Sequence, residues 1–171
     1  YNDEVIIPAI MNRGVSLRDA RVYNIIGCVE PQVPGKTDGW HDAAFFNMLR
    51  PLELVFTSGE DFGEQVGPRT MPVEEMTSFD QFYDAYQTQM NYFIRLMVNA
   101  DNSIDLAHAK RCPLPYQSSM IDDCISRGKS LQEGGAVYNF TGPQGFGIAN
   151  ATDALYAINA INQIIALLFY L

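Results

Sequence analysis

The sequence predicts a folded α/β chain that is rich in helix. Its 171 residues are 47% hydrophobic and 18% charged, which is the composition of a chain that buries a core. Ser78 and Gln81 have the spacing of a capping box, and apolar residues recur at helical spacing from Phe79 to Val98. The β-branched and aromatic run from Val22 to Val29 is typical of a buried strand, and it stops before Pro31.

Start and stop signals indicate further helices elsewhere in the chain. They are expected over residues 3–11 with Asp3 as the cap, over 17–21 with Ser16 as the start, over 120–127 with Gly128 after the end, and over 154–171 as a buried helix. Asp42 can cap a helix that ends at Gly59, with a kink at Pro51. The glycine-rich stretch from Gly134 to Asn150 indicates backbone in special conformations rather than a phosphate cradle, because its glycines lack the required order.

Charge and cysteine content exclude several classes of function. Twenty acidic against eleven basic residues give a net charge of −9, so nucleic acid and anionic membranes are poor partners. The three cysteines, Cys28, Cys112 and Cys124, form no CxxC pair and cannot all be paired in disulfides. A disulfide framework and a metal site are therefore not expected, and a reducing cytoplasm fits best.

The segment Gly27-Cys-Val-Glu30 places a thiol two residues before a carboxylate. In extended backbone, such side chains emerge on one face and can meet the same substrate. A neighbouring negative charge disfavours the thiolate, so the pair suits hydrogen-atom exchange at Cys28 with proton transfer at Glu30. The alternative is a small apolar cysteine at a strand end beside a solvated glutamate.

His41 and Asp42 follow the loop after this strand, and two interpretations remain open for them. A Cys28/His41 dyad would indicate a cysteine hydrolase, because an imidazole can take the proton of a thiol. Alternatively, His41 is a loop residue and Asp42 caps a helix.

Four segments form an ordered set of motifs: Gly27–Gln32, Gly35–Asn47, Cys112–Pro115 together with Ser126–Ser130, and Gly134–Asn150. Together they resemble the glycyl radical enzymes with a pyruvate-formate-lyase-like barrel, in the branch of the B12-independent glycerol and propanediol dehydratases. The resemblance covers residues 1–158 and implies an α/β fold, a portion of a ten-stranded β/α barrel with the cysteine on a central loop. Residues 159–171 depart from the family pattern and are expected to be an atypical apolar tail.

The resemblance also implies an activity, that of a carbon–oxygen lyase which removes water from a small diol. By position, Cys28 becomes a thiyl radical that abstracts a hydrogen atom, and Glu30 becomes the base. Asp42 and His41 are expected to contact substrate. Related lyases that cleave carbon–sulfur or carbon–nitrogen bonds, of the isethionate and choline types, are alternatives, and a catalytically incompetent structural fragment is the alternative from another class.

Cofactor and partners follow from the same resemblance. The radical is expected on a glycine outside this sequence, with no cofactor and no metal bound in this segment. An activating enzyme that uses S-adenosylmethionine and an iron–sulfur cluster is the expected partner, and the full-length parent is expected to be a cytoplasmic homodimer. The chain is expected to be an interior fragment and inactive alone, because the family's radical-glycine segment and N-terminal strands are absent from it.

Overall fold

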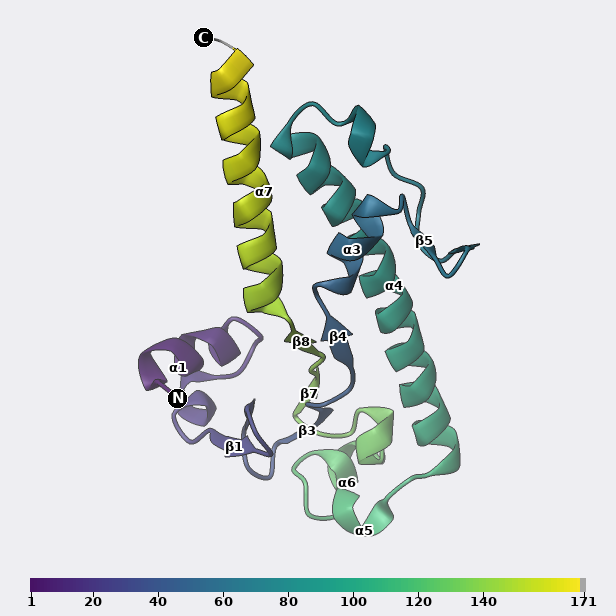
Figure 1. Ribbon diagram of the computed structural model, residues 1–171. Helices are drawn as coiled ribbons and strands as arrows, with labels where there is room; N and C mark the ends of the chain where they lie inside the picture. Colours follow the sequence, from purple (N-terminus) through teal and green to yellow (C-terminus); the bar gives the residue numbers. More distant parts are fainter. Residues whose placement is uncertain (170–171) are drawn as a thin grey trace. The chain divides into compact units, whose positions relative to one another are not determined.

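A computed structural model describes the chain over residues 1–169, with the side chains of residues 38–40 and 164–169 left aside (Figure 1). The chain divides into two compact units. The first contains Tyr1–Ala44 and Asp101–Pro143, and the second contains Phe45–Ala100 and Gln144–Leu171.

Both units mix helix and strand. The helices are α1 (Asp3–Met11), α2 (Leu17–Ala20), α3 (Arg50–Phe56), α4 (Phe79–Arg111), α5 (Pro115–Ser118), α6 (Cys124–Arg127) and α7 (Ile148–Phe169), with 3-10 turns η1 (Val73–Glu75) and η2 (Leu131–Glu133). The strands are β1 (Asn24–Ile26), β2 (Glu30–Gln32), β3 (Thr37–Trp40), β4 (Phe45–Asn47), β5 (Glu60–Asp61), β6 (Glu64–Gln65), β7 (Tyr138–Thr141) and β8 (Gln144–Phe146).

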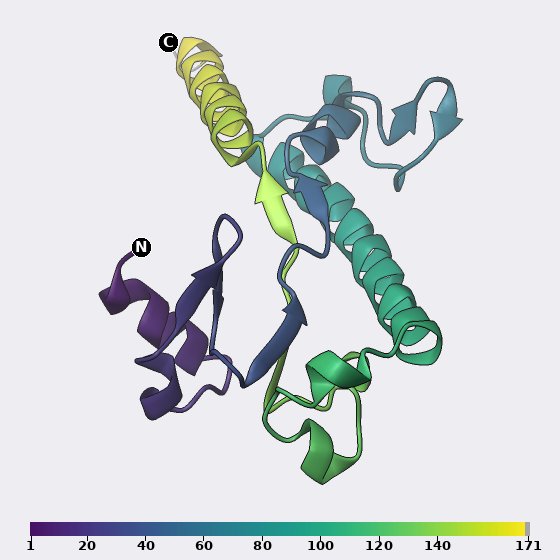
Figure 2. The same ribbon diagram turned by 90° about the horizontal axis from the view of Figure 1, so that it is seen from below.

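In the first unit, β1 and β2 form an antiparallel hairpin, and β3 pairs in parallel with β7. Figure 2 shows the hairpin beside α1 in the purple part of the chain. Apolar side chains of α1, α2 and the segment after β2 form the core between these elements. Its buried members are Ile10, Val15, Ala20 and Val33, and the rings of Tyr138 and Phe140 from β7 pack against them.

A polar cluster ties the ends of this unit together. The Lys36 ammonium lies 2.7 Å from Asp19 Oδ1, and the Tyr138 hydroxyl donates to Asp19 Oδ2 at 2.8 Å. Asp19 is largely buried at 9% exposure, and its backbone N–H is bonded by the Ser16 side chain at 3.2 Å. The cluster therefore fixes α2 against the segment that leads into β3 and against β7.

In the second unit, β4 pairs in parallel with β8, and β5 and β6 form a short hairpin. The core lies between α3, the first half of α4, and α7. Its buried members are Leu52, Val55, Phe82, Ala85 and Tyr86, with Ala154, Leu155 and Ile158 of α7 packed against them.

Several helix ends agree with the sequence prediction and several do not. Ser16 caps α2 and Gly128 ends α6 in the left-handed conformation, as predicted. The start predicted for the helix over residues 120–127 is wrong, because α6 begins only at Cys124. In α1 the cap is Asn2 rather than Asp3, since the Asn2 side chain accepts the Glu4 N–H.

The helix predicted from Asp42 to Gly59 is wrong in its first half. Residues 45–47 form β4, and α3 begins only at Arg50. Its start is satisfied by Asn47, whose Oδ1 accepts the Leu49 N–H at 3.0 Å. Pro51 lies in the first helical turn, where its missing N–H costs no hydrogen bond, so it produces no kink.

The strand predicted over Val22–Val29 is shorter than expected, because only β1 is extended and Gly27–Val29 form a turn. It is also largely exposed, with Ile26 at 45%. For α7 the predicted helix is present but it is not buried as predicted, because among its described side chains only Ala151 is buried and Tyr156 is 75% exposed. The end of the predicted tail, residues 170–171, lies outside the described residues.

No helix within residues 1–169 combines the length and the apolar character needed to cross a membrane.

The Asp19 cluster predicts an acid-dependent contribution to stability. The hydrogen bonds from Lys36 and then Tyr138 hold the pKa of the Asp19 carboxyl below its ordinary value of 3.8. Because the pKa of Asp19 is lower in the folded state, ionised Asp19 stabilises the fold, and this stabilisation is complete above pH 3.8. It is lost as the pH falls through the pKa that Asp19 has in the folded state. Asp19→Asn in the protein that carries this chain should lower the melting temperature at neutral pH, with a deficit that shrinks in acid, as measured by circular dichroism.

Asp123→Asn is the matched control. Its pair with Arg127 is exposed on both sides, so its loss should leave the melting temperature nearly unchanged. A deficit in Asp19→Asn that stays constant from neutral pH to pH 3 would contradict the assignment.

Candidate functional site

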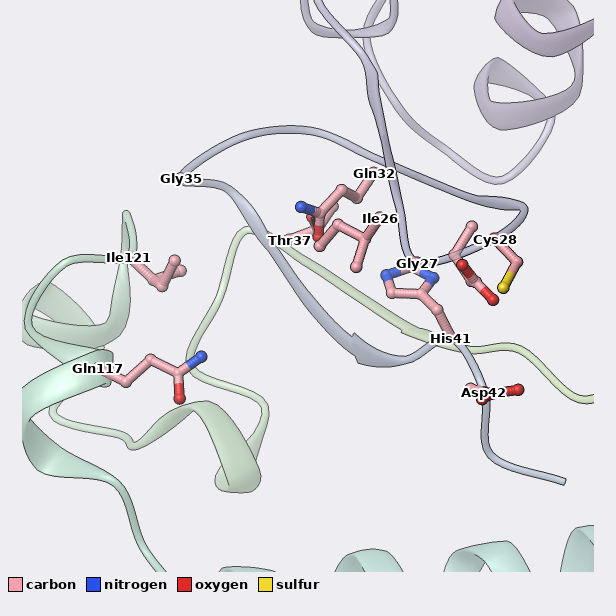
Figure 3. A pocket seen from close by; sticks show the side chains of 11 residues that line it. Ile26, Gly27, Cys28, Gln32, Gly35, Thr37, His41, Asp42, Gln117 and Ile121 are labelled. Atoms are coloured by element: carbon pink, nitrogen blue, oxygen red, sulfur yellow. Dashed lines mark hydrogen bonds between the residues drawn. The ribbon is translucent and has the colours of Figure 1, made fainter. Parts of the chain in front are cut away.

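A cavity of about 550 Å³ lies in the first unit (Figure 3). In this view the Cys28 sulfur, the His41 ring and the Asp42 carboxylate lie toward one end, and Gln117 and Ile121 lie toward the other. The full lining consists of Ile26, Gly27, Cys28, Glu30, Gln32, Gly35, Thr37, His41, Asp42, Gln117 and Ile121.

The thiol lies at the tip of the β1–β2 hairpin. Ile26 pairs with Glu30 across the hairpin, so Gly27, Cys28 and Val29 form the whole connection. Gly27 adopts φ 56°, in the left-handed region that glycine occupies without a steric penalty. Cys28 is exposed, and its carbonyl oxygen accepts a hydrogen bond from the Tyr1 hydroxyl.

The Glu30 carboxylate folds back over the same turn. Glu30 is only 7% exposed, and its Oε2 accepts the Val29 N–H at 3.0 Å. The sequence predicted that extended backbone brings Cys28 and Glu30 to one face. The backbone at Cys28 is not extended, because Cys28 is in a turn. The turn itself brings both side chains to the wall of one cavity.

His41 and Asp42 occupy the turn that follows β3. The His41 ring packs edge-on against Phe140 of β7, with centroids 6.1 Å apart. Gly142 approaches the His41 backbone so closely that a Cβ there would lie 3.2 Å from the His41 Cα. The capping interpretation of Asp42 is wrong, since α3 starts eight residues later, its N-cap residue is Leu49, and the Leu49 N–H is accepted by Asn47 Oδ1.

Seven lining residues were not among the predicted site residues: Ile26, Gly27, Gln32, Gly35, Thr37, Gln117 and Ile121. Thr37 is 5% exposed and braces the turn before β3, since its hydroxyl donates to the Val33 carbonyl at 3.1 Å and accepts the Val33 N–H at 3.2 Å. Gln32 is the last residue of the Gly27–Gln32 motif, which could have identified it. Gln117 has no such signal, because it reaches the cavity only through the fold.

The chemistry of the lining is acidic and polar. Two carboxylates, one imidazole and one thiol provide groups that can accept a proton, donate a proton or exchange a hydrogen atom. Among the described lining residues none is lysine or arginine. Within the described part of the chain, no three His, Cys, Asp or Glu side chains gather as metal ligands.

The family model for pyruvate formate lyase-like proteins matches residues 1–163. The chain is 39% identical to the (2S)-3-sulfopropanediol dehydratase of Klebsiella oxytoca, over 94% of this chain and 20% of the relative.

Two solved structures are more similar still. One comes from work on 1,2-propanediol dehydration in Roseburia inulinivorans, with 68% identity and a TM-score of 0.91 over 93% of this chain and 20% of that one. The other is the glycerol-bound B12-independent glycerol dehydratase of Clostridium butyricum, with 62% identity and a TM-score of 0.93 over 94% of this chain and 20% of that one.

These similarities confirm two sequence predictions, the glycyl radical enzyme resemblance and the fold as a portion of a β/α barrel. The chain spans about a fifth of the length of the relatives it matches.

Proposed function

The chain belongs to the pyruvate formate lyase-like family, and from that premise we propose that the protein containing it is a glycyl radical dehydratase that removes water from a small diol. One observation carries the proposal: the Cys28 thiol and the buried Glu30 carboxylate line one cavity. The similarity to enzymes of glycerol and 1,2-propanediol dehydration supports the same substrate class.

The position of Cys28 fits the radical cofactor of such enzymes. Cys28 is exposed at the tip of a hairpin, so a glycine on a segment outside residues 1–171 can approach its sulfur. That glycyl radical supplies the acceptor for the hydrogen atom of the Cys28 thiol.

In the proposed mechanism Cys28 transfers the hydrogen atom and Glu30 transfers the proton. The Cys28 sulfur takes a hydrogen atom from a carbon that bears a hydroxyl group, so a C–H bond breaks and an S–H bond forms. Glu30 accepts the proton of that hydroxyl, and the adjacent C–O bond breaks. The leaving hydroxyl group takes up one proton and departs as water. This proton balances the one that Glu30 has accepted, so the elimination releases no net proton. Return of the hydrogen atom from Cys28 completes the carbonyl product.

Asp42 and His41 bind the substrate in this proposal. Asp42 lines the cavity, where its carboxylate can accept a hydrogen bond from a hydroxyl group. His41 lines the same wall and can accept or donate one. The similarity to a (2S)-3-sulfopropanediol dehydratase makes a diol that carries a sulfonate the second candidate substrate.

The proposal extends to partners. The protein depends on an activating enzyme that uses S-adenosylmethionine and an iron–sulfur cluster, and it acts as a cytoplasmic homodimer. The direct test is electron paramagnetic resonance of the full-length protein after anaerobic activation. A glycyl doublet together with aldehyde formation from a diol supports the enzyme. A silent spectrum instead supports the structural alternative.

Cys28→Ser should abolish turnover in the full-length protein while the glycyl doublet still forms, because a hydroxyl cannot replace the thiol as a hydrogen-atom carrier. Product formation and the doublet are measured on the same sample. Cys112→Ser is the matched control, since Cys112 is also an exposed free cysteine but does not line the cavity. Turnover in Cys28→Ser would remove the assigned role.

Glu30→Gln should retain substrate binding and lose elimination, with kcat reduced by about 10²-fold or more. The amide oxygen of glutamine can still accept the Val29 N–H, so the turn is expected to persist. Steady-state kinetics and diol binding by calorimetry separate the two effects. A variant with unchanged kcat would exclude Glu30 as the base.

Asp42→Asn should weaken diol binding by about 1–3 kcal/mol, because the carboxylate is replaced by a weaker acceptor. Calorimetric titration of the unactivated full-length protein measures the change. Asp153→Asn on the exposed face of α7 is the control and should bind the diol normally. Equal affinities for the wild type and Asp42→Asn would show that Asp42 does not contact substrate.

A further inference from the structure

We propose that Gly27 is a positioning residue for Glu30. Because Gly27 has no Cβ, it leaves the space in which the Glu30 carboxylate lies across the turn that carries Cys28. The inference rests on the proposed function of Glu30 as the base, and it adds the residue that holds this base in place.

The space above Gly27 is filled by the carboxylate. A Cβ built on Gly27 would lie 2.7 Å from Glu30 Oε2 and 3.4 Å from its Cδ. The shorter distance is below any contact that a real Cβ makes. A single methyl group at this position therefore displaces the carboxylate or opens the turn.

The carboxylate is also held by the backbone of the turn. Glu30 Oε2 accepts the Val29 N–H at 3.0 Å, and the Glu30 backbone is paired with Ile26 across the hairpin. The strand pairing fixes the backbone, so a side chain at Gly27 is accommodated chiefly by movement of the Glu30 side chain. A methyl group at position 27 would displace Glu30 Oε2, and this oxygen would then no longer accept the Val29 N–H.

Backbone conformation alone does not distinguish Gly27. Gly14, with φ 93°, also adopts the left-handed region, but a Cβ built on it has no heavy atom within 4 Å. An alanine at Gly14 therefore introduces the backbone strain of a positive φ without a steric conflict. Gly14 also lies outside the cavity lining, so Gly14→Ala is a matched control for Gly27→Ala.

The first test needs no radical. In the full-length unactivated protein, hydrogen exchange of the Val29 amide should accelerate by about tenfold in Gly27→Ala, because its acceptor is displaced. Exchange at Val29 should be unchanged in Gly14→Ala. Val29 exchange at the wild-type rate in Gly27→Ala would overturn the proposal.

The second test separates the base from the thiol. In activated enzyme, Gly27→Ala should lower kcat by about 10²-fold with a smaller change in KM, since proton removal fails while binding persists. In D₂O, deuterium from the exchanged Cys28 thiol should still enter recovered substrate, because hydrogen abstraction continues. Loss of both kcat and deuterium incorporation would mean that the whole turn is disrupted and would overturn a specific role toward Glu30.

A double-mutant cycle completes the test. Glu30→Asp retracts the carboxylate by one methylene, so Gly27→Ala should reduce kcat less in the Glu30→Asp background than in the wild type. Additive effects would overturn the coupling. If the wild-type protein forms no glycyl radical, the proposed function fails, whereas the Val29 exchange experiment still decides whether Gly27 positions the Glu30 carboxylate.

Discussion

The hydrogen bond from the Val29 N–H to Glu30 Oε2 is the interaction on which the site depends. It fastens the carboxylate to the same three-residue turn that presents the Cys28 thiol. The relative position of the two groups is therefore set by a few bonds along one hairpin rather than by the packing of distant elements. This explains how a chain that spans about a fifth of its relatives still shows both groups on one cavity wall.

The side of the cavity that holds His41 and Asp42 is built in the opposite way. His41 and Asp42 follow β3, which is held by parallel pairing with β7, a segment about a hundred residues further along the chain. Gly142 lies against the His41 backbone just after β7 ends. This half of the site thus exists only when two remote segments are brought together, and the buried Asp19 cluster helps to align them.

This difference explains what the sequence could predict. Cys28 and Glu30 stand two positions apart, so a local motif was enough to select them, although the reason was a turn and not a strand. The helix wrongly predicted from Asp42 shows the limit. Phe45 and Phe46 suit either a helix or a strand, and pairing with β8 decides for a strand. Gln117 entered the lining only through tertiary structure.

The pairing of a thiol with a carboxylate also separates two kinds of cysteine chemistry. A hydrolase needs a thiolate, and a neighbouring carboxylate opposes the ionisation that forms it. A hydrogen-atom carrier uses the neutral thiol, so a carboxylate on the same wall does not oppose its reaction. The carboxylate can also act as the base that elimination requires. His41 lies on that wall as well, so the same lining also holds the imidazole that the hydrolase interpretation requires. The thiol and the carboxylate on one wall are the two groups that the proposed radical elimination uses.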